Sequence, residues 1–200
     1  MRALILVDIQ NDFCTGGALA VADGEAVVPL ANQLMATADL VVATQDWHPA
    51  DHGSFAVNHP GRKPFELGDL AGLPQVLWPA HCVQWTGGAQ FHPGLDTRRI
   101  DLAFAKGTDP TIDSYSGFFD NGRRKATGLG DWLIAKGVDE VMICGLATDY
   151  CVKATAVDAV QLGFRTLLAA AACRGVGLQA GDVPAALQAM RDAGVVIHGS

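Results

Sequence analysis

The sequence is short of basic residues, of long apolar runs and of paired cysteines. Lysine and arginine number 14 against 21 acidic residues, and no basic run offsets the net charge of -7. A surface for nucleic acid or anionic membrane is therefore not expected. No segment approaches the roughly 20 apolar residues of a membrane helix, and Ala3 to Val7 is too short for a signal peptide. The 5 cysteines lack paired spacing, which favours reduced thiols in a cytoplasm.

The chain does have enough apolar residues for one core. Of its 200 residues 50% are hydrophobic, and a chain of this size buries roughly 70% of its unfolded surface. No linker, internal repeat or low-complexity tract divides it. We expect a single domain over residues 1–200, in a soluble cytoplasmic protein that is either a monomer or a homo-oligomer.

Short apolar segments alternate with amphipathic helical stretches along the chain. The predicted strands are Ala3–Asp8, Leu40–Gln45, Leu102–Lys106, Glu140–Cys144, Arg165–Ala169 and Val195–His198. The predicted helices are Glu25–Ala38, Asp131–Lys136, Tyr150–Leu162 and Pro184–Asp192. The strands are nearly continuous apolar runs, which is typical of a sheet covered on both faces. The pattern predicts an α/β fold, a Rossmann-like three-layer α/β/α sandwich around a mainly parallel six-stranded sheet.

The region from Trp47 to Asp101 departs from this alternation. It holds six of the nine prolines and five of the six histidines. We interpret it as a long ordered loop region, and long loops inside compact domains are usually functional.

A cysteine follows the fourth predicted strand. The run from Glu140 to Cys144 breaks at Gly145, and a helical pattern opens near Tyr150, so Cys151 is predicted in the first turn of a helix. The helix N-terminus there favours a thiolate, and its free N–H groups suit an oxyanion. The segment indicates a nucleophile for acyl transfer, and the alternative is an inert buried thiol.

Four polar residues stand at or after the carboxyl ends of four predicted strands: Asp8 and Lys106 end theirs, and Asp46 and Cys151 follow theirs. In an open parallel sheet these ends share one edge, where such folds bind ligands. There Cys151 attacks a carbonyl, Asp8 takes the thiol proton and returns it to a leaving amine, and Lys106 stabilises the anions. The alternative is that Asp8 and Lys106 form a structural ion pair.

Histidines in the long loop suggest a metal site. Asp46 and His48 project to the same side of an extended backbone, and His81 in the segment Trp78–Gln84 completes the set. Carboxylate and imidazole ligands suit a catalytic zinc, iron or manganese ion with open positions. The alternative is a group of hydrogen-bonded loop histidines. The glycine-rich segment after Arg174 mimics a dinucleotide fingerprint, but Gly181 and Asp182 interrupt it where the helix should start.

These motifs together resemble a known family from one end of the chain to the other. The chain is similar to the nicotinamidase (pyrazinamidase) family of the isochorismatase-like cysteine hydrolase superfamily. The matching segments are Val7–Phe13, Asp46–Pro49, Trp78–Gln84, Lys106–Gly107 with Tyr115–Phe118, and Gly145–Val152. The Asp, Lys and Cys pattern is shared by the superfamily, whereas the metal motifs are specific to nicotinamidases.

The resemblance implies a site and an activity. It implies a catalytic triad of Cys151, Asp8 and Lys106, and one divalent metal ion, zinc in preference to iron or manganese, on Asp46, His48 and His81. It also implies an oxyanion hole from the N–H groups of Ala147 and Cys151, a cis peptide between Leu146 and Ala147, and a pyridine slot enclosed by Phe13, Trp78 and Tyr115. Whether His52 is a further ligand stays open.

The implied reaction is hydrolysis of nicotinamide, and of pyrazinamide, through a thioester in NAD salvage, with the small-molecule substrate as the only expected partner. Two rivals remain. The first is another amidohydrolase of the superfamily, acting on carbamoyl or ureido substrates, which would lack the set Asp46, His48 and His81. The second is a non-enzymatic metal-binding or partner-binding protein on the same fold, which the intact triad disfavours.

Overall fold

The centre of the molecule is a parallel β-sheet. The structure is a computed structural model that describes residues 1–199. The six strands have the order β5-β2-β1-β6-β7-β8, and all neighbouring pairs are parallel. The strands are β1 (Arg2–Val7), β2 (Leu40–Asp46), β5 (Leu102–Lys106), β6 (Glu140–Leu146), β7 (Arg165–Arg174) and β8 (Val196–His198). The predicted six-stranded parallel sheet is confirmed.

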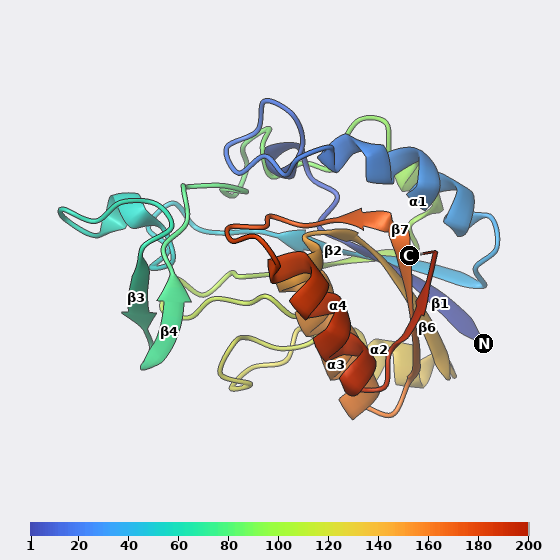
Figure 1. Ribbon diagram of the computed structural model, residues 1–200. Helices are drawn as coiled ribbons and strands as arrows, with labels where there is room; N and C mark the ends of the chain where they lie inside the picture. The colour runs from blue at the N-terminus through green and yellow to red at the C-terminus, as the bar shows by residue number, and fades with distance from the viewer. Residues whose placement is uncertain (200) are drawn as a thin grey trace.

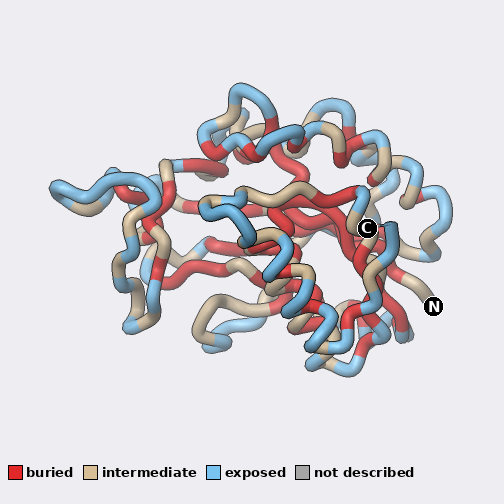
Figure 2. The backbone as a smooth tube through the Cα atoms, viewed as in Figure 1, coloured by how far each residue is buried: buried red, intermediate tan, exposed pale blue. Residues whose placement is uncertain are grey.

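Helices cover both faces of this sheet. Figure 1 shows α1 (Val27–Met35) over one face, with α2 (Leu129–Ala135), α3 (Lys153–Gln161) and α4 (Asp182–Asp192) on the other. In α1 the buried residues Val27, Val28, Ala31 and Met35 recur at helical spacing, so one apolar stripe packs on the sheet. Figure 2 shows the inner strands buried between these layers. The three-layer sandwich is therefore as predicted, and no helix within residues 1–199 is long and apolar enough to cross a membrane.

The strand order places a crevice between β1 and β6. The chain winds from β1 through β2 to β5 on one side, and from β6 through β7 to β8 on the other. Ligands of open α/β sheets bind outside the carboxyl ends of the strands at such a switch point. Asp8 directly follows β1, and Cys151 comes shortly after β6. The topology thus brings residues far apart in sequence to one place.

The long loop region contains a hairpin that the sequence did not indicate. Strands β3 (Leu67–Leu70) and β4 (Leu73–Val76) pair antiparallel as a separate two-stranded sheet. The hairpin stands apart from the helices, on the left of Figure 1. Its strands are short, and Pro74 and Gly68 weaken the strand signal. The prediction of a loop without strands was wrong here.

The turn that carries Cys151 also differs from the prediction. Residues Thr148–Val152 form a π-helical turn, and the α-helix begins only at Lys153. Single π-helical turns are rare and frequent at functional sites. The peptide bond joining Leu146 and Ala147 is cis, as the resemblance implied.

Candidate active site

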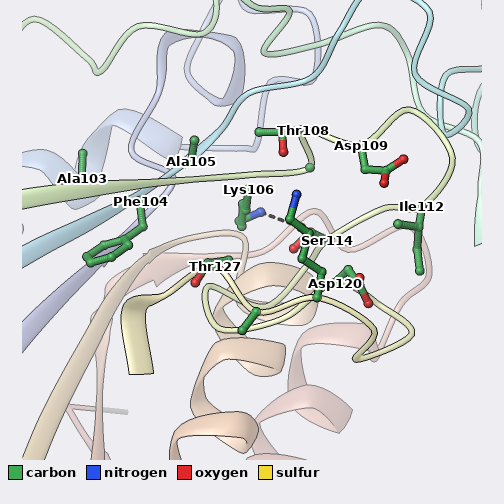
Figure 3. A pocket seen from close by; sticks show the side chains of 13 residues that line it. Ala103, Phe104, Ala105, Lys106, Thr108, Asp109, Ile112, Ser114, Asp120 and Thr127 are labelled. Carbon is green, nitrogen blue, oxygen red and sulfur yellow. Dashed lines mark hydrogen bonds between the residues drawn. The ribbon is translucent and has the colours of Figure 1, made fainter. Parts of the chain in front are cut away.

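Lys106, the last residue of β5, holds the centre of the site. Its Nζ atom lies 2.9 Å from Asp8 Oδ2 and pairs with Asp46 Oδ1. It also donates to the Ser114 carbonyl at 2.9 Å, the bond drawn in Figure 3, and to Cys151 Sγ at 3.3 Å. Burial alone would lower the pKa of Lys106, but the two carboxylates raise it well above its usual value. The ammonium therefore stays charged.

Asp8 is fully buried between Thr44 and Lys106. Its Oδ1 accepts a hydrogen bond from Thr44 Oγ1 at 2.6 Å. Its Oδ2 faces Lys106 as an ion pair but has no donor aligned with it, so a lone pair remains open. Burial raises the pKa of Asp8 to about 6, against the opposing pull of Lys106. A carboxylate that is ionised at neutral pH and easily protonated suits a general base that later acts as an acid.

Cys151 closes the triad. A carboxylate oxygen of Asp8, one of Asp46 and Cys151 Sγ all lie within 4.8 Å of one another. Burial raises the pKa of the Cys151 thiol well above its usual value, although Lys106 opposes this. Burial thus opposes the thiolate that a helix N-terminus favours, because removal from water costs a thiolate more than the nearby cation returns. The resting group is a thiol, and it needs a base beside it.

The residues predicted to bind metal lie together and fit an ion. One atom each from Asp46, His48 and His81 lies within 4.8 Å of the others, with the two Nε2 atoms 3.6 and 3.8 Å from Asp46 Oδ2. The Nδ1 atom of His48 donates to the Gly107 carbonyl, and that of His81 donates to the Pro79 carbonyl. Each ring in its neutral form therefore turns its Nε2 lone pair toward Asp46, the arrangement that metal ligands adopt. This group can hold a divalent metal ion.

Asp46 belongs both to the metal-ligand group and to the surroundings of the triad. Its Oδ1 pairs with Lys106 of the triad, and its Oδ2 faces the two imidazoles. Burial alone would raise the pKa of Asp46, but Lys106 and His48 hold it well below its usual value. The carboxylate is thus ionised, as a metal ligand must be.

His52 lies beside this ligand group. It lies against His48, with ring centroids 4.4 Å apart, and its Nδ1 bonds to Ser54 Oγ at 2.7 Å. It forms a second possible group with His48 and Asp113. Burial and His48 lower the pKa of His52 to about 4, so the ring is neutral.

The predicted slot residues line one small cavity with Cys151 and the ligand group. Its walls include Phe13, Trp78, Tyr115 and Ala147, together with Cys151, Asp46, His48 and His81. The indole Nε1 of Trp78 donates to Tyr115 Oη at 3.3 Å, which fixes the two rings relative to each other. Flat apolar walls beside a thiol and a ligand group suit a small aromatic amide.

A larger cavity of about 420 Å³ lies on the other side of Lys106. It runs along the edge strand β5 and shares Lys106 and Ser114 with the site; Figure 3 shows its lining. The sequence alone did not single out Ser114, because it acts through its carbonyl and any residue type supplies one.

Two polar residues that the sequence analysis did not identify support the site: Thr44 beside Asp8, and Asp149 in the turn that carries Cys151. Thr44 stands two residues before Asp46 on β2 and bonds to Asp8; the alternation of side chains along a strand was a signal for it. Asp149 accepts the N–H groups of Val176 and Gly177 at 2.9 and 2.8 Å. The glycine-rich segment therefore binds a carboxylate of its own chain, in agreement with its rejection as a nucleotide motif.

Comparison with known proteins defines the class. A model of the isochorismatase domain matches residues 2–199, and the chain belongs to this family. Among its relatives, nicotinamidase of Escherichia coli is 52% identical over 201 residues, which cover 98% of this chain and 94% of the relative.

Solved structures agree. A nicotinamidase/pyrazinamidase from Acinetobacter baumannii matches with a TM-score of 0.95 and 48% identity, over 98% of this chain and 94% of that one. Pyrazinamidase of Pyrococcus horikoshii in complex with zinc matches with a TM-score of 0.81 and 37% identity, over 100% of this chain and 99% of that one.

Proposed function

We propose that this protein is a metal-containing amidase that hydrolyses nicotinamide to nicotinate and ammonia, acts also on pyrazinamide, and serves NAD salvage in the cytoplasm. One observation carries the proposal. The thiol of Cys151 and the ligand group of Asp46, His48 and His81 line the same small cavity, between Phe13, Trp78 and Tyr115. One small aromatic amide can therefore meet the nucleophile and the metal ligands together. The nicotinamidase relatives reported above support this choice of substrate.

The reaction follows from the protonation states of the triad. Asp8 takes the proton of the Cys151 thiol, and the sulfur attacks the amide carbon while Lys106 stays charged beside both. N–H groups of Ala147 and Cys151 receive the developing oxyanion. Asp8 then returns the proton to the leaving nitrogen, ammonia departs, and a thioester remains on Cys151. Asp8 next takes a proton from water, whose oxygen attacks the thioester; the acid leaves, and the proton returns from Asp8 to the Cys151 sulfur.

Asp46, His48 and His81 would hold the metal ion, and we propose zinc. The zinc complex of the Pyrococcus horikoshii pyrazinamidase supports that identity. The ion would supply a Lewis acid that orients the ring nitrogen of the substrate. The flat walls from Phe13, Trp78 and Tyr115 exclude water from the ring faces and align the amide with Cys151.

The test compares three substrates on one batch of metal-replete protein, with ammonia release as the measurement. Nicotinamide is expected to exceed benzamide in kcat/KM by about 100-fold or more, because benzamide has the same shape without the ring nitrogen. A linear ureido compound is expected to react least, since Phe13, Trp78 and Tyr115 give the cavity aromatic walls that suit a flat ring. Equal rates for nicotinamide and benzamide would remove the metal from substrate recognition. A preference for the ureido compound would establish the rival amidohydrolase instead.

A further inference from the structure

In the segment that follows β1, every second residue contacts the site or a loop that carries it: Asp8, Gln10 and Asp12. Asp8 belongs to the triad, whereas Gln10 and Asp12 have no role in the reaction proposed above. Gln10 is fully buried, and its side-chain amide bonds to both the N–H and the carbonyl of Asp46, each at 2.8 Å. The backbone of Asp46, one of the metal ligands, is therefore held by the segment that directly follows β1.

Asp12 holds the loop of another ligand. Its Oδ2 accepts the N–H of Cys82, the residue after His81, at 2.7 Å. Its Oδ1 accepts the N–H of Ala18 at 3.1 Å in the loop that follows Phe13. A charged acceptor makes such bonds roughly twice as strong as a neutral one. The Asp12 carboxylate thus ties the loop that carries His81 to the loop that follows Phe13, one of the slot walls.

The backbone of Cys82 needs this support. Its φ is 46°, in the left-handed region that residues with a side chain rarely adopt. Its carbonyl accepts the N–H of His48 at 3.1 Å, while its own N–H is bound by Asp12. The peptide units around Cys82 therefore link His48 and His81, and the left-handed turn sets where the imidazole of His81 points. Strained conformations of this kind persist only where the surroundings enforce them.

We propose that Asp12 is a positioning residue that sets the metal affinity of the site by holding Cys82, and with it His81, in register with His48 and Asp46. The proposal rests on the metal site of the proposed function. Asp12 lies outside the ligand set, and its side-chain hydrogen bonds go to backbone N–H groups, so it acts through the backbone. Loss of its carboxylate leaves all three ligands present but frees the loop of one of them.

The test measures zinc affinity of the full chain by competition with a chromophoric chelator. Asp12→Ala is expected to bind zinc about 10- to 100-fold more weakly than wild type, the usual effect of removing a group that orients a ligand. Asp12→Asn keeps an oxygen that can accept the Cys82 N–H, and is expected to lie between the two. Excess zinc is expected to restore most of the activity of both variants.

The matched control is Asp69→Ala. Asp69 is exposed on β3, just before the β3–β4 turn, and also accepts a backbone N–H, that of Gly72 at 3.1 Å, but it is not among the residues of the site. It is expected to bind zinc as wild type does, and thermal unfolding of the metal-free variants measures any general loss of stability. Wild-type zinc affinity in Asp12→Ala overturns the proposal. Should Asp12→Ala not fold, wild-type zinc affinity in Asp12→Asn together with lowered stability of that variant overturns it as well. Absence of zinc binding by wild type overturns the metal site itself.

Discussion

At the scale of single residues, burial decides the chemistry of Cys151. The residue is 6% exposed and its thiol is neutral at rest, so its reactivity depends on Asp8 rather than on a helix N-terminus. The other cysteines are equally buried, and burial raises their pKa values as well. What distinguishes Cys151 is a carboxylate with an open lone pair and an ammonium ion beside it.

The first prediction concerns this thiol. Brief treatment with limiting iodoacetamide is expected to label Cys151 first, as read by mass spectrometry, because only this cysteine combines the cavity with an adjacent base. Cys151→Ala is expected to lose turnover by more than about 1000-fold with its fold intact. In Asp8→Asn the labelling of Cys151 is expected to slow markedly. Dominant labelling of Cys14, Cys82, Cys144 or Cys173 contradicts the assignment of the nucleophile.

The second prediction is a pH dependence set by Asp8. This residue accepts the thiol proton only when ionised, and its pKa is about 6 in the folded protein. The value of kcat/KM, which reports the free enzyme, is expected to be level above this pH and to fall about tenfold per unit below it. Metal content must be measured across the same range, since protonated ligands release metal. An unchanged rate down to pH 4 excludes Asp8 as the base.

At the scale of elements, the approach of β1 and β6 shapes the crevice. Gly145 near the end of β6 has a φ of 123°, and a Cβ there would overlap the carbonyl oxygen of Val7 on β1. Because this oxygen belongs to a buried strand, it has no room to move. The close contact lies one residue before Asp8 and just before the turn that carries Cys151, so the two residues that we propose as base and nucleophile are held by the same strand pair.

The third prediction tests that contact. Gly145→Ala is expected to lower the free energy of unfolding by more than about 3 kcal/mol, from backbone strain and overlap together. Gly163 also has a positive φ, 92°, but open space around it, and Gly163→Ala is expected to cost only about 1–2 kcal/mol. Urea denaturation of both variants provides the comparison. Equal losses would show that strain alone, and not the approach of the strands, requires glycine at position 145.

At the scale of the whole molecule, the metal site joins parts of the chain that are otherwise linked by loops. Asp46 ends β2, whereas His48 and His81 stand at the two ends of a long segment that includes the β3–β4 hairpin. A bound ion therefore ties this segment to the sheet. Because the ion binds the folded chain and not the unfolded one, its binding energy adds to stability.

The fourth prediction follows from this linkage. Zinc at about 100 times its dissociation constant adds about 2.7 kcal/mol, and for 150–250 residues each kcal/mol moves Tm by about 2–4 °C. Zinc is therefore expected to raise Tm of the metal-free protein by roughly 5–11 °C. Elemental analysis is expected to find about one divalent ion per chain. His48→Ala and His81→Ala are expected to lose the ion and the Tm shift, and retention of either would exclude those histidines as ligands.

The sequence by itself determined the sheet and the location of the site. Strands and helices follow from local apolar patterns. A polar residue stands at the end of each of four strands: Asp8, Asp46, Lys106 and, beyond a turn, Cys151. Parallel strands bring these ends together whatever the details of packing, because that is the geometry of the fold. The segments around His48 and His81 were equally visible, since metal ligands are carried by side chains of particular types.

Only the tertiary structure decided how these groups act. The open lone pair of Asp8, the pKa of Cys151 and the division of Asp46 between Lys106 and two imidazoles depend on burial and on partners far apart in the chain. The β3–β4 hairpin likewise forms against the local propensity of its residues, and local propensity does not predict the π-helical turn. Side-chain types are written in the sequence, but the loss of water around a group and the atoms that replace it arise only when the chain folds.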